Sequence, residues 1–415
     1  MDFLRTLDRS TVWLWLVLAT AAVFPWHERL SAVGIVLLVL HWLWDRDLVY
    51  KITRFRPNPV ALLSWAFFFW HLLGLTWSGH RAEGWQSVEV KLSLLLLPLL
   101  FSTENHLHGD RRLWLERVFI YSCLLSFLFC MAHSFLTHPG APLSVVFFRM
   151  NISAALMHPG YYSNYLLFAL ILLALQMMRA RPRIAWPDML SGALLLFALF
   201  ILLSKTALFC LGVFLLYIGW KVTARLNPLP LRIGLFAGTF LILLLLAFRL
   251  PPLASRLQET LGETAAVQPA HLLIGNSTGS RLAAWSLEWD LITRKPWLGY
   301  GTGSANPELL NALQREGYTN LVIHGMHTHQ QFLHTWLDLG LPGLLLLTAW
   351  LSVLLLSMLG RHGDETGRWL FLLLAINLLT DDMLEIQAGM VFFTFFLMLI
   401  IYRNAGYVKR RRYAY

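Results

Sequence analysis

Charged residues are scarce in this chain. Of its 415 residues only 13% are Asp, Glu, Lys or Arg, whereas 57% are hydrophobic. A soluble domain carries about 25% charged residues, so a deficit spread over the whole length excludes an ordinary soluble enzyme. The composition predicts a protein that crosses a membrane many times.

Cysteines are few, and a signal for cleavage is missing. Cys123, Cys130 and Cys210 all lie in apolar runs, which excludes a disulfide framework and a cysteine metal site.

The first apolar run, "TVWLWLVLATAAVF", is followed by no small-residue cleavage site. We therefore interpret it as the first span and not as a signal peptide.

Long apolar runs predict an all-α polytopic membrane protein with about twelve transmembrane helices. The expected spans lie near residues 11–26, 30–44, 60–78, 92–103, 113–136, 161–178, 190–204, 206–222, 231–248, 341–359, 369–380 and 390–402. The chain then divides into residues 1–248 with nine spans, a long, mainly helical loop over 249–340, and residues 341–415 with three spans and a basic tail.

The basic residues that give the chain its net charge of +10 are distributed as the predicted topology requires. With the N-terminus inside, most of the 33 lysines and arginines fall in short loops on the cytoplasmic side, as the positive-inside bias requires. Both termini are therefore expected in the cytoplasm, and the loop 249–340 faces outward. The tail "RNAGYVKRRRYAY" is interpreted as an orientation signal that binds lipid headgroups and not nucleic acid.

Four histidines in eleven positions open the stretch "HGMHTHQQFLHTWLDLGLPG", residues 324–343. A helix is expected to begin at His329 with that ring on its buried face, to turn Gln331, His334 and Asp338 away, and to break at the Gly-Leu-Pro-Gly. A zinc site needs three or four ligands at defined spacing, so metal is the least favoured role here. A structural histidine and a catalytic or ligand-binding histidine both stay open for His329, and we favour the second.

The segment "GNSTGSRLAAWSLEWDLITRKPWLGYGTG" predicts a helix over residues 281–293, capped by Gly279–Ser280, with tryptophans on one stripe. Arg281 would lie in its first turn, where it either grips an anion or simply faces water or headgroups. The "GYGTG" lacks a preceding strand and a following Lys-Ser/Thr pair, which excludes a phosphate loop.

Three further outward positions carry charge beside apolar sequence. Lys205 stands in the tight turn "LLSKTALF", where it either binds an anion or snorkels to the interface. Arg149 and His158 lie in an apolar frame in which a partly buried arginine needs an anionic partner. The acidic residues of "LLTDDMLEIQAGM", Asp381, Asp382 and Glu385, either orient such a cation or merely solvate a short loop, and we favour the second interpretation.

These motifs, taken together, resemble a known family. "HTHQQFLHTWLDLGLPG" resembles the His-Asn-x-Tyr-Leu … Glu-x-Gly-x-x-Gly motif of the O-antigen ligase and polymerase superfamily. "SRLAAWSLEWDLITRKPWLGYGTG" and "LSKTA" resemble its Arg-x-x-x-Trp … Pro-x-x-Gly-x-Gly segment and its Ser-Arg-Gly/Ala turn. Gln330 replaces the usual Asn, Phe332 the usual Tyr and Lys205 the usual Arg; lysine keeps a point charge but loses paired hydrogen bonds.

The resemblance implies a glycan transferase of the bacterial inner membrane, with its active site in a periplasmic loop domain, residues 249–340. The implied donor is O-antigen on undecaprenyl diphosphate, and the implied acceptor is a sugar hydroxyl of lipid A–core. No cofactor and no metal are expected, because cationic side chains would neutralise the diphosphate. The implied catalytic residues are His329 as general base and Arg281, and the implied substrate-binding residues are Lys205, Arg149, His327 and His158.

Other functions stay open. An O-antigen polymerase or a protein–glycan ligase would use the same lipid-linked donor, and donor motifs cannot separate the three. A transporter or flippase is less favoured, because it predicts ionisable groups at mid-bilayer and an internal repeat, and the sequence shows neither. The oligomeric state is not encoded in any of these patterns.

Overall fold

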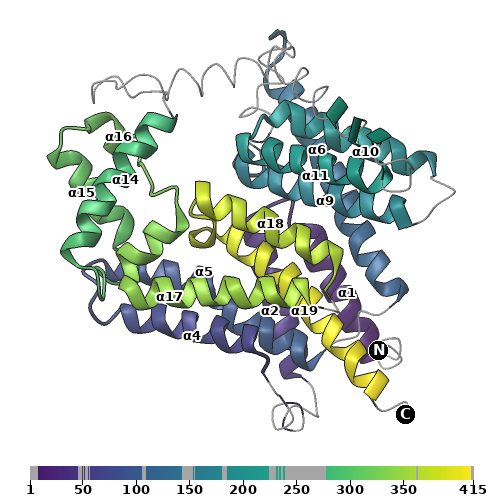
Figure 1. Ribbon diagram of the computed structural model, residues 1–415, viewed down its shortest axis with the longest axis horizontal. Helices are drawn as coiled ribbons and strands as arrows, with labels where there is room; N and C mark the ends of the chain where they lie inside the picture. Colours follow the sequence, from purple (N-terminus) through teal and green to yellow (C-terminus); the bar gives the residue numbers. More distant parts are fainter. Residues whose placement is uncertain are drawn as a thin grey trace. The chain divides into compact units, whose positions relative to one another are not determined.

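The computed structural model describes residues 8–44, 57–104, 109–142, 155–179, 185–223, 277–360 and 363–412, with a few single residues between these ranges. Within them the chain forms helices and no strand (Figure 1). In chain order these are α1 (Arg9–Val23), α2 (Glu28–Leu43), α4 (Pro59–Gly74), α5 (Arg81–Thr103), α6 (Asp110–Thr137), α9 (Pro159–Arg179), α10 (Trp186–Leu202), α11 (Lys205–Thr223), α14 (Ser277–Arg294), α15 (Ala305–Arg315), α16 (Thr319–Ile323), α17 (Gln331–Leu359), α18 (Glu365–Thr380), the 3-10 turn η3 (Met383–Glu385) and α19 (Gln387–Arg412).

Each predicted span that falls mainly in the described residues forms a helix over most of its length. Among those residues, five helices are long and apolar enough to cross a membrane, namely α5, α6, α9, α11 and α17, and α1, α4, α10 and α19 include shorter apolar helices. The all-helical class is thus confirmed for this part of the chain. Most of the predicted span 231–248, and the loop before residue 277, lie outside the described residues, so the count of twelve spans stays a prediction.

The helices fall into two compact units. One unit comprises Met1–Ser126 and Ala283–Tyr415, and the other comprises Phe127–Leu282. In the first unit α17 packs against α4 and α18, while α19 packs against α5, so helices from the two ends of the chain share one bundle (Figure 1). Phenylalanine rings fill its interior, and the rings of Phe119 and Phe396 pack edge to face with centroids 5.0 Å apart.

Glycines join the loop after α14 to this bundle. The carbonyl of Pro296 accepts a hydrogen bond from the backbone N–H of Leu341 at 2.9 Å, and a Cβ on Gly340 would lie 2.0 Å from the carbonyl oxygen of Trp297. Gly340 also has a φ of 66°, which glycine adopts without strain. The "GYGTG" and "GLPG" motifs are therefore packing motifs. The expected helix break is confirmed, because the backbone of Gly340 is non-helical and α17 consists of two helices that meet there at a kink.

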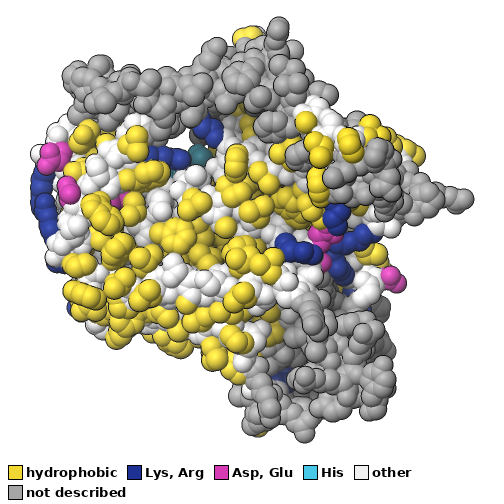
Figure 2. Space-filling view, in the orientation of Figure 1, with side chains coloured by type: hydrophobic (Ala, Val, Ile, Leu, Met, Phe, Trp, Pro, Cys, Tyr) yellow, Lys and Arg dark blue, Asp and Glu magenta, His cyan; other side chains and the backbone are white. Residues whose placement is uncertain are grey.

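Apolar side chains cover much of the outside of the first unit. Hydrophobic groups dominate the visible face over α17 and α4 (Figure 2). On these helices Phe69, Leu345 and Leu356 are 52%, 58% and 67% exposed. Large apolar side chains in contact with water are unfavourable, so this face suits the lipid tails of a membrane.

In the second unit α9 packs against α10 and α11. From Tyr162 to Leu173 every residue of α9 is buried, as expected for a central helix that is apolar all round. Helix α10 ends at Leu203 in a left-handed conformation with a φ of 50°, and α11 begins two residues later at Lys205. This is the tight turn that the sequence predicts.

Candidate functional site

His329 lies in the loop between α16 and α17, and its backbone is strained. Its φ is 48°, and among the described residues only Leu203 shares a positive φ without being glycine. A left-handed non-glycine residue persists only where its surroundings hold it, and such residues gather at functional sites. The prediction that His329 heads the helix is therefore wrong, because α17 begins two residues later at Gln331.

Gln330 explains where the helix begins. Its side-chain oxygen accepts a hydrogen bond from the backbone N–H of Leu333 at 2.5 Å, so Gln330 is the N-cap of α17. Asparagine is a preferred N-cap residue for the same reason. The replacement of the family's usual Asn by Gln330 thus keeps the capping oxygen at this position.

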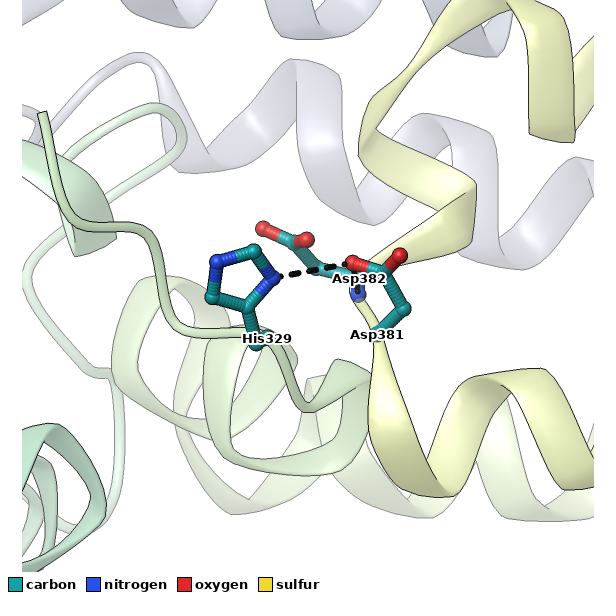
Figure 3. A group of neighbouring side chains, drawn as sticks. All are labelled: His329, Asp381 and Asp382. Atoms are coloured by element: carbon teal, nitrogen blue, oxygen red, sulfur yellow. Dashed lines mark hydrogen bonds and ion pairs between the residues drawn. The ribbon is translucent and has the colours of Figure 1, made fainter. Parts of the chain in front are cut away.

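An acidic partner holds the imidazole of His329. Its Nδ1 lies 3.2 Å from Oδ1 of Asp381, which follows α18, and the two side chains are 28% and 24% exposed. The other ring nitrogen points away from Asp381 (Figure 3). A carboxylate that accepts the Nδ1 proton fixes the tautomer and leaves Nε2 able to accept a proton. His329 and Asp381 therefore form a histidine–carboxylate dyad.

Asp382 stands beside this dyad. Atoms of His329, Asp381 and Asp382 that can bind a metal all lie within 4.8 Å of one another, and nitrogen and carboxylate ligands suit zinc. Asp382 is 3% exposed, and burial raises the pKa of its carboxyl to about 6, although His334 opposes the shift. The interpretation of these acids as loop-solvating residues is wrong. Metal-independent chemistry stays a prediction, since this group is able to bind an ion.

The polar side of α17 faces the interior. Gln331, His334 and Asp338 are 0%, 4% and 1% exposed, so the prediction that they turn away from the core is wrong. Gln331 accepts a hydrogen bond from the backbone of Leu384 and donates one to Glu385, each at 2.8 Å. Buried polar groups need such partners, and here the partners come from η3.

A buried ion pair supports the same turn. Nζ of Lys91 in α5 lies 2.5 Å from Oε2 of Glu385, and the lysine side chain is fully buried. Burial alone would raise the pKa of the Glu385 carboxyl, but Lys91 and His334 hold that pKa below its usual range. The sequence analysis missed this pair. Its signal was a lone lysine in the apolar run "VEVKLSLLLLPLLF", because a charge in such a run needs a partner.

Arg281 is not in the first turn of its helix. Helix α14 begins at Ser277, so the predicted cap at Gly279–Ser280 and the helix-terminus argument for anion binding are wrong, since the dipole acts within the first turn. The tryptophan stripe is only partly buried. Trp289 is 51% exposed and Ile292 is 1% exposed, while Trp285 donates to the backbone carbonyl of Thr328 at 2.9 Å.

The remaining predicted residues are dispersed. His327 is exposed, with its ring centroid 6.0 Å from that of His329. His158 is exposed just before α9, and its Nδ1 accepts a hydrogen bond from the backbone of Gly160 at 3.2 Å. Lys205, His158 and Arg281 belong to the second unit and the dyad to the first, so their meeting around one substrate stays a prediction. Arg149 lies outside the described residues.

A comparison with protein families finds a match over part of the chain. The family model that matches is described as O-Antigen ligase. Residues 190–348 match the O-antigen ligase family. The resemblance drawn from the sequence motifs is thereby confirmed for this segment, and no curated protein matches the chain.

The O-antigen ligase match covers Lys205, Arg281, His327 and His329. It ends before the acids of η3 and begins after Lys91 in α5. Together with the apolar helices, it supports a bacterial membrane protein of the O-antigen ligase and polymerase type, which is a glycosyltransferase-like enzyme.

Proposed function

We propose that this protein transfers O-antigen from undecaprenyl diphosphate to a sugar hydroxyl of lipid A–core, at the periplasmic face of the bacterial inner membrane. The observation that carries the proposal is the dyad of His329 and Asp381, whose histidine stands at a strained backbone position within the O-antigen ligase match. A glycosyl transfer to a hydroxyl needs a base for the hydroxyl proton, and imidazole titrates near neutral pH.

In the proposed step, Nε2 of His329 takes the proton of the acceptor hydroxyl. The hydroxyl oxygen forms a bond to the anomeric carbon of the donor, and the bond from that carbon to the diphosphate breaks. Undecaprenyl diphosphate leaves with the bonding electron pair. Asp381 accepts a hydrogen bond from Nδ1, and its negative charge stabilises the imidazolium that forms.

The leaving diphosphate needs positive charge beside it. Arg281 is the proposed catalytic cation, and Lys205 and Arg149 are the proposed phosphate-binding residues, because a guanidinium grips phosphate with paired hydrogen bonds and lysine binds it as a point charge. His327 and His158 are proposed as further substrate contacts. No cofactor is required, since the donor carries its own leaving group.

The test uses the purified full-length protein with lipid-linked glycan and lipid A–core. A ladder of glycan on lipid A, separated on a gel, is the expected product, and His329→Ala should lower its rate by about 10²–10⁴-fold. Growth of the lipid-linked chain would instead assign a polymerase. Movement of intact donor across vesicles without a new bond would assign a flippase. Loss of activity in a chelator, restored by zinc or magnesium, would contradict metal-independent transfer.

The proposed orientation places both termini in the cytoplasm and the loop outside. In a variant whose three cysteines are replaced by serine, Ser286→Cys on the exposed side of α14 should react with an impermeant thiol reagent in intact spheroplasts. Tyr407→Cys in the basic tail should react only after lysis. The reverse pattern would overturn the periplasmic assignment of His329.

A further inference from the structure

A cavity of about 260 Å³ opens within the first unit. Helix α5 contributes Glu83, Gln86 and Ser87, which lie three and four positions apart and therefore share one helix face. Asn306 from the start of α15, His334 from α17 and Glu385 from η3 complete the polar lining. The volume falls below the roughly 300–1,000 Å³ of drug-sized pockets, which suits one sugar unit of a longer chain.

The lining offers acceptors for hydrogen bonds, and the basic side chain among its described residues, His334, already lies against the carboxylate of Glu385 at 3.5 Å. Among the described residues no lysine or arginine lines this cavity, and the nearby Lys91 is buried and bound to Glu385 and Ser87. Oδ1 of Asn306 is buried and has no hydrogen-bond partner. An unpaired buried acceptor is costly, so a hydroxyl or ammonium donor that enters the cavity would be favoured.

The cavity lies next to the dyad. Nε2 of His334, one of the lining side chains, is 3.5 Å from Glu385, and Nδ1 of the same ring is 3.7 Å from Asp382. Asp382 in turn lies beside His329 and Asp381. His334 and Asp382 therefore connect the cavity to the dyad, and His329 is not itself one of the lining residues.

We infer that this cavity binds the acceptor sugar, a saccharide unit that is neutral or amino-substituted. The inference rests on the proposed glycan transfer. The reacting donor sugar is excluded because its anomeric carbon is bonded directly to the diphosphate. The cations next to the cavity, Lys91 and His334, already pair with Glu385. Phosphates of that sugar would therefore lie close to the carboxylate of Glu83 with no lysine or arginine among the described lining residues to offset it, and like charges repel strongly where water is scarce. An acceptor hydroxyl brings no such charge.

The experiment measures binding separately from transfer. The probe is core oligosaccharide freed of lipid A, in dephosphorylated and phosphorylated forms, titrated calorimetrically into the full-length protein in detergent. The dephosphorylated form should bind more tightly. Glu83→Gln, at an exposed position where folding is not at risk, should weaken binding about 3–10-fold, and the double variant Glu83→Gln/Asn306→Leu about 10–100-fold. Asp290→Asn, an exposed acid of α14, is the matched control and should bind like the wild type.

The outcomes separate the two proposals. Tighter binding of the phosphorylated form, no binding by the wild type, or unchanged binding by the double variant would overturn the acceptor cavity even if transfer occurs. Binding with the expected dependence on Glu83 and Asn306 in a protein that transfers no glycan would support the cavity and refute the proposed function. In the transfer assay, the same variants should raise KM for the acceptor and leave KM for the donor unchanged.

Discussion

Replacing Lys91 should destabilise the protein strongly, and a second replacement should rescue it. Lys91→Met leaves the carboxylate of Glu385 buried without its closest cation, and only the more distant ring of His334 remains beside it. At the observed 2.5 Å separation the attraction between the two charges is about 7 kcal/mol for an effective dielectric constant of about 20. The cost of burying the lysine offsets part of this. Removing one partner of a buried pair costs about 3–5 kcal/mol, and this is the expected loss in the free energy of unfolding.

The rescue separates charge from packing. In Lys91→Met/Glu385→Gln no charge of this pair is left unpaired, and the amide oxygen can still accept the hydrogen bond that Gln331 donates to Glu385. Replacing a buried pair with neutral side chains is often close to neutral, so the double variant should lie within about 1–2 kcal/mol of the wild type. Lys221→Met, at an exposed lysine of α11, is the control and should change stability by less than about 1 kcal/mol.

The assay is thermal unfolding in detergent, followed by intrinsic tryptophan fluorescence. For a unit of this size 3–5 kcal/mol corresponds to a fall in Tm of roughly 6–10 °C. A double variant that is no more stable than Lys91→Met would refute the electrostatic reasoning and assign the loss to packing. A single variant that melts like the wild type would refute the buried ion pair itself.

Three further predictions concern the site. Asp381→Asn should lower kcat about 10- to 1,000-fold, because an amide stabilises the imidazolium poorly, whereas Asp290→Asn should match the wild type in the same transfer assay. Arg281→Lys should lower the rate of transfer about 10–100-fold, because lysine cannot form the paired hydrogen bonds of a guanidinium. Lys205→Arg should keep the transfer activity, and Lys205→Ala should lose most of it. Full transfer by Lys205→Ala would indicate a lysine that only snorkels to the interface. Burial raises the pKa of Glu288 well above its ordinary range, so the folded state holds that proton more tightly than the unfolded state, and stability should fall as the pH rises above about 4.3. When Tm is measured across pH, Glu288→Gln should lack this part of the fall. Parallel curves of Tm against pH for the variant and the wild type would show that Glu288 is not the group responsible.

Hydropathy correctly predicted where the helices lie, but it did not predict which face of α17 is buried. The argument for α17 placed its apolar stripe inward, as it would be in water. Among the described residues Phe332, Leu333 and Trp336 are only half-buried, whereas Gln331, His334 and Asp338 are buried. Both faces of this part of α17 meet protein: Leu333 and Trp336 pack against a buried cluster that includes Leu291 and Ile292 of α14 and Ala305 of α15, while the polar face contacts η3. Periodicity identified the two faces of the helix correctly and gave no information on what covers each of them.

The pairing of His329 with Asp381 could not be predicted from the sequence, for a different reason. His329 and Asp381 are 52 residues apart, and no local pattern predicts a pairing at that distance. Motif resemblance identified the histidine, since its stretch lies within the matched segment, but its partner Asp381 follows the end of that segment. The strain at His329 was equally hidden, because a positive φ at a non-glycine residue depends on contacts from elsewhere in the fold.

The buried polar contacts give the dyad its geometry. Asp381 leads directly into η3, which is held by Gln331 from α17 and, through Glu385, by Lys91 from α5. Gln331 is only two residues beyond His329, so one side chain ties the base to the turn that carries its partner. Lys91 then acts as a positioning residue. Its loss should lower transfer through a displaced Asp381, and the double variant should recover activity as it recovers stability. A double variant that folds fully and transfers no glycan would separate the two roles, and would give Lys91 or Glu385 a part in the reaction itself.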